Sequence, residues 1–148
     1  MQEKQLKIHA KAYFKLLETA NWIDQQVKSC LHQFDITHAQ YNVLRILKGS
    51  IPSPLSSTDI KDRTIVSSPD MTRLQDRLIK KKLIEKRICP DNRRKVEVMI
   101  SEKGIELLED IQPIIMEKVR YFYHEHINEQ QAQQLYDILH KIRTSKRG

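Results

Sequence analysis

The sequence predicts a mainly α-helical protein that carries a small two-stranded β-ribbon between long helices at its two ends. Three observations lead to this fold class. Apolar residues recur at helical spacing in both terminal regions, side chains alternate with period 2 beyond residue 83, and only three of the 148 residues are glycine. These two periods are the main sequence marks of helices and half-buried strands. Scarce glycine also disfavours a glycine-rich phosphate-binding loop.

A single apolar stripe predicts an N-terminal helix of about 30 residues, roughly 45 Å long. Asp24 interrupts the stripe, and Trp22 and Ile23 widen it. Such a helix overshoots a small domain, so its apolar face needs a partner, either the C-terminal helices or a second subunit. The stripe consists of Leu6, Ala10, Tyr13, Leu17, Ala20, Val27, Leu31 and Phe34.

Two shorter helices are predicted next. Thr37 and Gln40 have the spacing of a capping box, which marks the start of a helix. A loop rich in Ser and Pro follows, and either Ser56 or Ser57 then caps a third helix near residues 59–64. Together with the helix that follows, these segments predict a helix-turn-helix.

The next helix is predicted to begin with Ser68 as N-cap and Pro69 at its first position. Met71, Leu74 and Leu78 then lie on one apolar face. A helix of this kind can pack on a small core and present its other face to the major groove of DNA. That outer face carries Pro69, Thr72, Arg73, Asp76, Arg77 and Lys80.

A two-stranded ribbon with a basic tip is predicted after this helix. Residues 84–88 and 96–100 alternate between the two faces, as half-buried strands do. Pro90, Asp91 and Asn92 favour a turn over residues 89–95. A helix followed by such a ribbon is the outline of a winged helix. The basic tip consists of Arg93, Arg94 and Lys95.

Two amphipathic helices complete the predicted chain. Ser101 caps the first of them, and Pro113 lies inside it, where a kink is expected. The second opens at residues 128–131. The apolar stripes are Leu108, Ile111, Ile115, Val119 and Phe122 in the first helix, and Ala132, Leu135, Ile138, Leu139 and Ile142 in the second.

The positive charge is concentrated in one segment. The net charge is +7, and between Lys61 and Lys103 there are thirteen Lys and Arg against seven Asp and Glu. A basic patch confined to one module is expected of a protein that binds a polyanion. Two function classes follow: a DNA-binding regulator, or a helical interaction module whose basic face binds an acidic protein or a membrane surface. The sequence shows no catalytic constellation, so no enzyme is predicted.

Neither metal ions nor disulfides are predicted. Cys30 and Cys89 form no disulfide framework and no metal-ligand spacing. His124 and His126 are two residues apart and do not face each other on a helix. No apolar run is long enough to span a membrane and no signal peptide opens the chain, so a cytoplasmic protein is expected.

One stretch is similar to a known family. The run TRLQDRLIKKKLIEKR, followed by PDNRRKVEVMISEKG, resembles the recognition helix and wing of the MarR family of bacterial transcription regulators. Asp91 and Arg93, followed by a strand and the Ser101-x-Lys103-Gly104 sequence, carry the most specific part of the resemblance. Lys82 stands where the family usually has glycine. It must either take a left-handed conformation or end the helix in another way.

The resemblance implies a single domain over residues 1–148 that forms a homodimer. In it, residues 1–36 and 104–148 are dimerisation helices and residues 37–103 form the DNA-binding lobe. The implied function is repression of a pseudo-palindromic operator, controlled by a small, often aromatic, ligand between the dimer arms and the lobe; no cofactor is implied. Expected dimer contacts are Leu6, Tyr13, Leu17, Ile115, Leu135, Ile138, Leu139 and Ile142.

The predicted contacts with double-stranded DNA have distinct roles. Arg73 and Arg77 can donate to guanine edges, and Thr72 can meet a thymine methyl group. Arg93 can enter a minor groove, with Asp91 either orienting its guanidinium or only capping the turn. Phosphate contacts are expected from Lys61, Arg63, Ser67 and Ser68, and Pro69, Lys80 and Arg94 complete the predicted interface.

Some members of the family sense oxidants through a cysteine in the first helix. Cys30 lies at the end of the predicted first helix, beside its apolar stripe. A buried structural thiol is therefore favoured over a sensor at this position.

Overall fold

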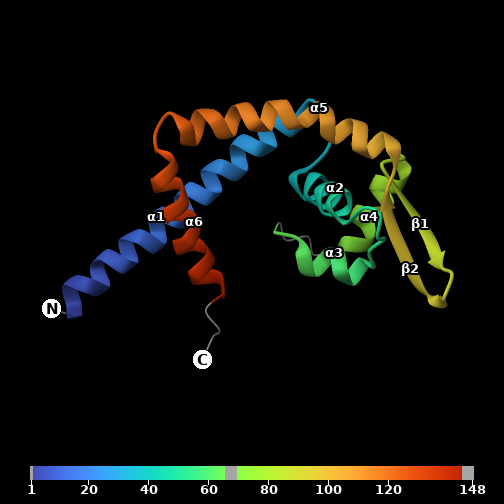
Figure 1. The fold of residues 1–148 in the computed structure, drawn as a ribbon, viewed down its shortest axis with the longest axis horizontal. Helices are drawn as coiled ribbons and strands as arrows, with labels where there is room; N and C mark the ends of the chain where they lie inside the picture. Colours follow the sequence, from blue (N-terminus) through green and yellow to red (C-terminus); the bar gives the residue numbers. More distant parts are fainter. Residues whose placement is uncertain (1, 66–69, 145–148) are drawn as a thin grey trace. The chain divides into compact units, whose positions relative to one another are not determined.

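The computed structural model describes residues 2–65 and 70–144, with side chains from residue 7 onward (Figure 1). Internal contacts divide the chain into two compact units, Met1–Ile111 and Gln112–Gly148. The mainly helical fold class with a two-stranded wing is confirmed. In chain order the elements are α1 (Gln2–His32), α2 (His38–Ser50), α3 (Ser57–Arg63), α4 (Met71–Lys80), β1 (Ile84–Cys89), β2 (Asn92–Ile100), α5 (Glu102–Val119), η1 (Arg120–His124) and α6 (Glu129–Thr144).

The N-terminal helix α1 spans 31 residues, which confirms its predicted length. It ends before Phe34, which therefore does not extend the apolar stripe. Asp24, which interrupts that stripe, forms an ion pair with Lys28 and a hydrogen bond with His38 of α2, both at 2.6 Å. The hydrogen bonds from these two side chains lower the pKa of Asp24. The interruption is thus a polar link between α1 and α2.

The helix-turn-helix consists of α2, α3 and α4, which pack on one another and on the ribbon. The predicted capping box of Thr37 with Gln40 begins α2. Of the two predicted caps for α3, Ser56 is the N-cap, and it forms a second capping box with Asp59. The loop before α3 also pairs with the ribbon, because Leu55 and Val98 exchange backbone hydrogen bonds of 3.1 and 2.8 Å. The most deeply buried apolar side chains of this lobe are Val43, Leu44, Leu47, Ile60, Leu78, Ile84 and Val98.

The start of α4 differs from the prediction. Its first residue is Met71, and its N-cap is Asp70, whose carboxylate accepts a hydrogen bond of 2.9 Å from the backbone N–H of Arg73. The predicted cap Ser68 and the predicted first residue Pro69 lie outside the described residues. Asp is as good an N-cap as Ser, so capping preference alone did not separate the two positions.

Of the two helix ends considered for Lys82, the structure shows the left-handed one. Lys82 takes the left-handed conformation with a φ of 61°. Its N–H donates to the carbonyl of Ile79 at 2.8 Å, and the N–H of Leu83 donates to the carbonyl of Leu78 at 2.9 Å. This pair of bonds is the Schellman motif. Leu78 and Leu83, the first and last residues of this motif, are both buried.

Gly104 allows α5 to approach this turn closely. A Cβ at Gly104 would lie 2.3 Å from the carbonyl oxygen of Leu83 and 2.7 Å from the Ile100 side chain. Ser101 caps α5 as predicted, accepting from the Gly104 N–H at 3.0 Å, and its hydroxyl donates to the Lys82 carbonyl at 2.7 Å. The Ser101–Gly104 segment therefore fixes the base of the ribbon against the end of α4.

The ribbon is longer than predicted, because its strands continue into the expected turn and leave only Pro90 and Asp91 as turn residues. The strands are antiparallel from Ile84 opposite Ile100 to Ile88 opposite Val96. The register then shifts, and Cys89 pairs with Asn92. The three consecutive cations Arg93, Arg94 and Lys95 therefore lie in the irregularity between two successive pairs.

The second unit begins within α5 and ends with α6. The helix α5 continues through Pro113 to Val119, where a π-helical turn, Arg120–His124, replaces the α-helix expected as far as Phe122. Asn128 and Gln131 cap α6 reciprocally, with two hydrogen bonds of 2.9 Å between side chain and backbone. The predicted start of the last helix is therefore correct to within a residue.

Candidate nucleic-acid interface

The outer face of α4 presents cations without counter-charges. Arg73, Arg77 and Lys80 are exposed, whereas Met71, Leu74 and Leu78 are buried, as the helical spacing predicted. Over residues 2–65 and 70–144, no side-chain hydrogen bond or ion pair engages any of these three cations. Thr72 is exposed beside them. The face therefore offers two guanidinium groups, an ammonium group and a methyl-bearing hydroxyl to a partner.

The acidic residue on the same face, Asp76, forms an ion pair with the ribbon. The carboxylate of Asp76 lies 3.6 Å from the Nζ atom of Lys86 on β1. This contact offsets part of the negative charge that would oppose a polyanion and links α4 to the ribbon.

Two buried polar side chains hold the helix-turn-helix in place, and sequence reasoning missed both. The Oδ1 atom of Asn42, on α2, accepts hydrogen bonds from the Thr64 hydroxyl at 2.8 Å and from the Ile65 N–H at 3.2 Å. Asn42 thereby anchors the start of the turn between α3 and α4. Gln75, fully buried on α4, accepts from the Ser57 hydroxyl at 3.0 Å. The sequence signal that could have revealed them is an uncharged polar residue at a position where the helical pattern predicts an apolar one.

The helix α3 carries Lys61 and Arg63 in its last turn, both exposed. Its N-terminal capping box lowers the pKa of Asp59, because the Ser56 hydroxyl and backbone N–H donate to its carboxylate. The short helix is thus held at its start by the cap and carries cations at its end.

The ribbon also presents exposed cations near its tip. Arg93, Arg94 and Lys95 are exposed, and Asn92 orders this stretch by accepting from the Arg94 N–H at 3.0 Å. Across the strands, Arg87 pairs with Glu97 at 2.7 Å, and this hydrogen bond lowers the pKa of Glu97. Within the described residues, no hydrogen bond or ion pair joins Asp91 to Arg93. The turn-capping role weighed for Asp91 is taken here by Asn92.

Several other residues predicted to make contacts lie outside the residues that the structure describes. Ser67, Ser68 and Pro69 fall in the undescribed segment before α4, and the side chain of Leu6 precedes the described side chains. The remaining predicted dimer contacts lie on α1, α5 and α6. Tyr13, Leu17, Leu135, Ile138 and Ile142 are 58, 49, 39, 57 and 57% exposed in the single chain, and Ile115 and Leu139 are half-buried.

The two cysteines and the histidines show no sign of a metal centre in the part of the chain that the structure describes. Cys30 is buried with 7% of its surface exposed, the environment of a structural thiol. Cys89 is half-buried at the end of β1. Among the described helices, none combines the length and the apolar character needed to cross a bilayer.

These features define a class of protein. A capped helix-turn-helix, an outer helix face with exposed cations and a basic ribbon make a winged-helix DNA-binding module. Residues 36–96 match the model of the MarR family. The transcriptional regulator MhqR of Bacillus subtilis is 30% identical over 113 residues, covering 76% of this chain and 74% of that protein. The chain belongs to the MarR family of transcription regulators.

Solved structures share the same fold. The MarR transcription factor of Planctomyces limnophilus is 30% identical, with a TM-score of 0.65 over 91% of this chain and 95% of that one. MepR of Staphylococcus aureus in complex with DNA is 24% identical, with a TM-score of 0.80 over 90% of this chain and 97% of that one. At 24% identity, the similarity to MepR is a similarity of fold alone.

Proposed function

We propose that the protein is a homodimeric repressor whose two α4 helices enter successive major grooves of a pseudo-palindromic operator. The observation that carries this proposal is the set of exposed cations on the outer face of α4 and near the tip of the ribbon. Arg73 and Arg77 read base edges, and Thr72 meets a thymine methyl group. Lys61 and Arg63 on α3, with Ser67 and Ser68, hold phosphates, while Lys80, Arg94 and Pro69 complete the interface.

The dimer in this proposal is formed by residues 1–36 and 104–148, leaving residues 37–103 as the DNA-binding lobe. Its support is the apolar surface that α1 and α6 expose in the single chain, including Tyr13, Leu17 and Ile138. A small, often aromatic, ligand held between the dimer arms and the lobe controls DNA binding. The protein is cytoplasmic, where its operator is accessible.

Selection of random duplex DNA on the purified protein tests the proposal. A two-fold symmetric site should emerge, with half-sites roughly 10 base pairs apart from centre to centre, since a dimer presents its helices one DNA turn apart. The family relation and the fold favour this outcome over the second candidate, a basic module that binds an acidic protein or membrane surface. Selection without enrichment, together with retention on acidic vesicles, would favour that second candidate.

A further inference from the structure

Gln75 is a polar side chain on the buried face of α4. It lies among the apolar residues Leu74 and Leu78, and none of its surface is exposed. Two residues along an α-helix are separated by a rotation of about 200°. Gln75 is two residues from Arg73 and two from Arg77, so it lies across the helix from both. A contact made by Gln75 is therefore made directly behind the two guanidinium groups of the outer face.

The Gln75 side chain links α4 to α3. Its Oε1 atom accepts a hydrogen bond of 3.0 Å from the hydroxyl of Ser57, the first residue of α3. Within the described residues, this is the one side-chain hydrogen bond between the two helices. Apolar burial has no preferred direction, whereas a hydrogen bond weakens when its length or angle changes. The Ser57–Gln75 bond is therefore suited to fix the rotation of α4 about its own axis.

The other end of the same carboxamide destabilises the fold. The Nε2 atom of Gln75 is buried and has no hydrogen-bond partner in the described part of the chain. A buried donor without an acceptor costs free energy, whereas an apolar side chain of the same shape can be nearly neutral or stabilising. Stability therefore does not explain a glutamine at this position. In some proteins, a buried polar group instead fixes a single arrangement of the elements around it.

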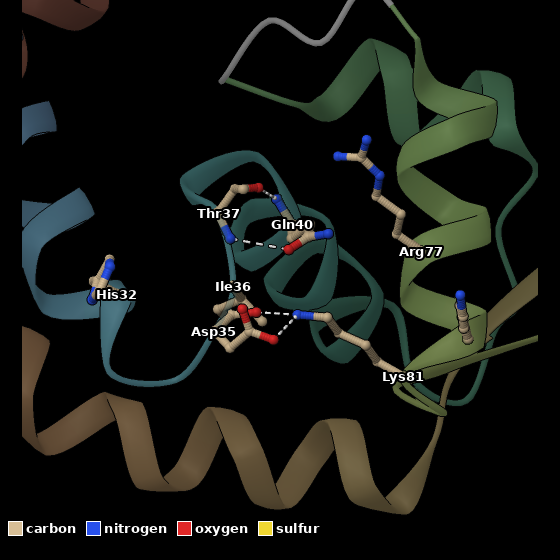
Figure 2. Close-up of a pocket in the computed structure, with 8 residues that line it drawn as sticks. His32, Asp35, Ile36, Thr37, Gln40, Arg77 and Lys81 are labelled. Atoms are coloured by element: carbon tan, nitrogen blue, oxygen red, sulfur yellow. Dashed lines mark hydrogen bonds and ion pairs between the residues drawn. The ribbon is translucent and has the colours of Figure 1, made fainter.

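We propose that Gln75 is a positioning residue for DNA recognition. Through its bond to Ser57 it holds α4 at one rotation, so that Arg73 and Arg77 project together toward the base edges. Figure 2 shows Arg77 extending from α4 with no bond to the other residues drawn. The direction of Arg77 therefore follows from the rotation of the helix that carries it. The inference rests on the proposed function, which assigns base contacts to Arg73 and Arg77.

Four variants separate positioning from packing. Gln75→Met keeps an unbranched side chain of similar length and removes the carboxamide, while Ser57, at an exposed position, can bond to water instead. Ser57→Ala removes the same bond and leaves the buried carboxamide without a partner at either end. Ser57→Thr keeps the hydroxyl, and its extra methyl group lies at an exposed position. Val43→Ala, at a fully buried position on α2, is the control that loses packing but keeps the bond.

Two measurements on each variant test the role in DNA recognition: urea unfolding at one fixed protein concentration, and the ratio of operator affinity to random-duplex affinity. Gln75→Met should be as stable as the wild type or more stable, yet its affinity ratio should fall about two- to tenfold, the range of one hydrogen bond. Ser57→Ala should lose both stability and ratio, Ser57→Thr should match the wild type, and Val43→Ala should lose stability alone. A wild-type ratio in Gln75→Met, or an equal fall in Val43→Ala, would overturn the proposal.

A measurement without DNA keeps this inference distinguishable from the proposed function. Residual dipolar couplings of the backbone amides of α3 and α4 report the relative orientation of the two helices in the full-length protein. The wild type and Ser57→Thr should fit the single arrangement of the structure, whereas the α4 couplings should be reduced or reoriented in Gln75→Met and Ser57→Ala. Unchanged couplings in Gln75→Met would overturn the positioning role. If the couplings change as expected but no operator is found, the proposed function fails and the role of Gln75 in holding α4 stands.

Discussion

Two residues of the described chain hold backbone conformations that their side chains disfavour. Asp35 and Lys82 have φ angles of 52° and 61°. Both lie at helix ends, where a left-handed residue lets the chain turn sharply. The Asp35 side chain pairs with Lys81, next to Lys82 in the chain. The strain is therefore concentrated where the loop before α2 meets the end of α4.

Lys82→Gly should stabilise the protein by about 1 kcal/mol, because a left-handed conformation costs a non-glycine residue about 1–2 kcal/mol and glycine recovers part of it. Urea unfolding at one fixed protein concentration measures the change. Lys80→Gly is the matched control and should destabilise by about 1 kcal/mol, since Lys80 lies within the helix. A loss of stability in Lys82→Gly would mean that the lysine side chain contributes more than its conformation costs.

The proposed roles of α4 in base contacts and of α3 in phosphate contacts can be tested at single residues. Arg73→Ala should cost about 1–3 kcal/mol in operator binding and relax the preference at one base of each half-site. Lys61→Ala should weaken operator and random DNA alike, because a phosphate contact carries no sequence information. Fluorescence anisotropy on both duplexes measures the two variants. Equal losses on both duplexes for Arg73→Ala would reassign Arg73 to a phosphate.

At the scale of elements, the ribbon is where sequence and structure differ most. The cations Arg93 and Arg94 lie in an irregularity of the register, and Asp91 holds neither of them in the described structure. Within the described residues, Asp91 therefore does not restrain the guanidinium groups of Arg93 and Arg94. We expect a DNA groove to order them on binding.

Arg93→Ala should weaken operator binding and remove any preference for A·T-rich flanks, because narrow A·T minor grooves attract an inserted arginine. Binding to operators that differ only in their flanks measures this preference. Asp91→Ala should also weaken binding if Asp91 orients Arg93 in the complex. Tighter binding by Asp91→Ala at fixed salt would show that its charge only repels phosphate.

Local signals in the sequence predicted most of the elements. The capping boxes of α2 and α3 involve residues three apart, so Thr37 and Ser56 could be recognised without knowing the fold. Asn42 could not, because its partners Thr64 and Ile65 are more than 20 residues away. The ribbon register was also missed, since it depends on pairing across strands rather than on alternation within each. Of the site, the exposed cations were predictable, whereas the buried contacts of Asn42 and Gln75 were not.

At the scale of the whole molecule, dimerisation should depend on the apolar faces of the terminal helices. Leu17→Asp should give monomer or unfolded chain in sedimentation at micromolar concentration, because a dimer would bury an unpaired charge. Lys11→Asp introduces the same residue at a polar position of α1 and should remain dimeric. A folded wild-type monomer under these conditions would contradict the proposed assembly.

The central claim is that the cations of α3, α4 and the ribbon bind DNA, and a salt titration tests it most directly. Affinity for a selected operator and for a random duplex is measured from low to high salt. If the dimer makes roughly six to ten phosphate contacts, the log–log slope should be roughly −5 to −9 on the operator, which should stay the tighter ligand throughout. A nearly flat titration, or equal affinity for the two duplexes, would contradict the claim.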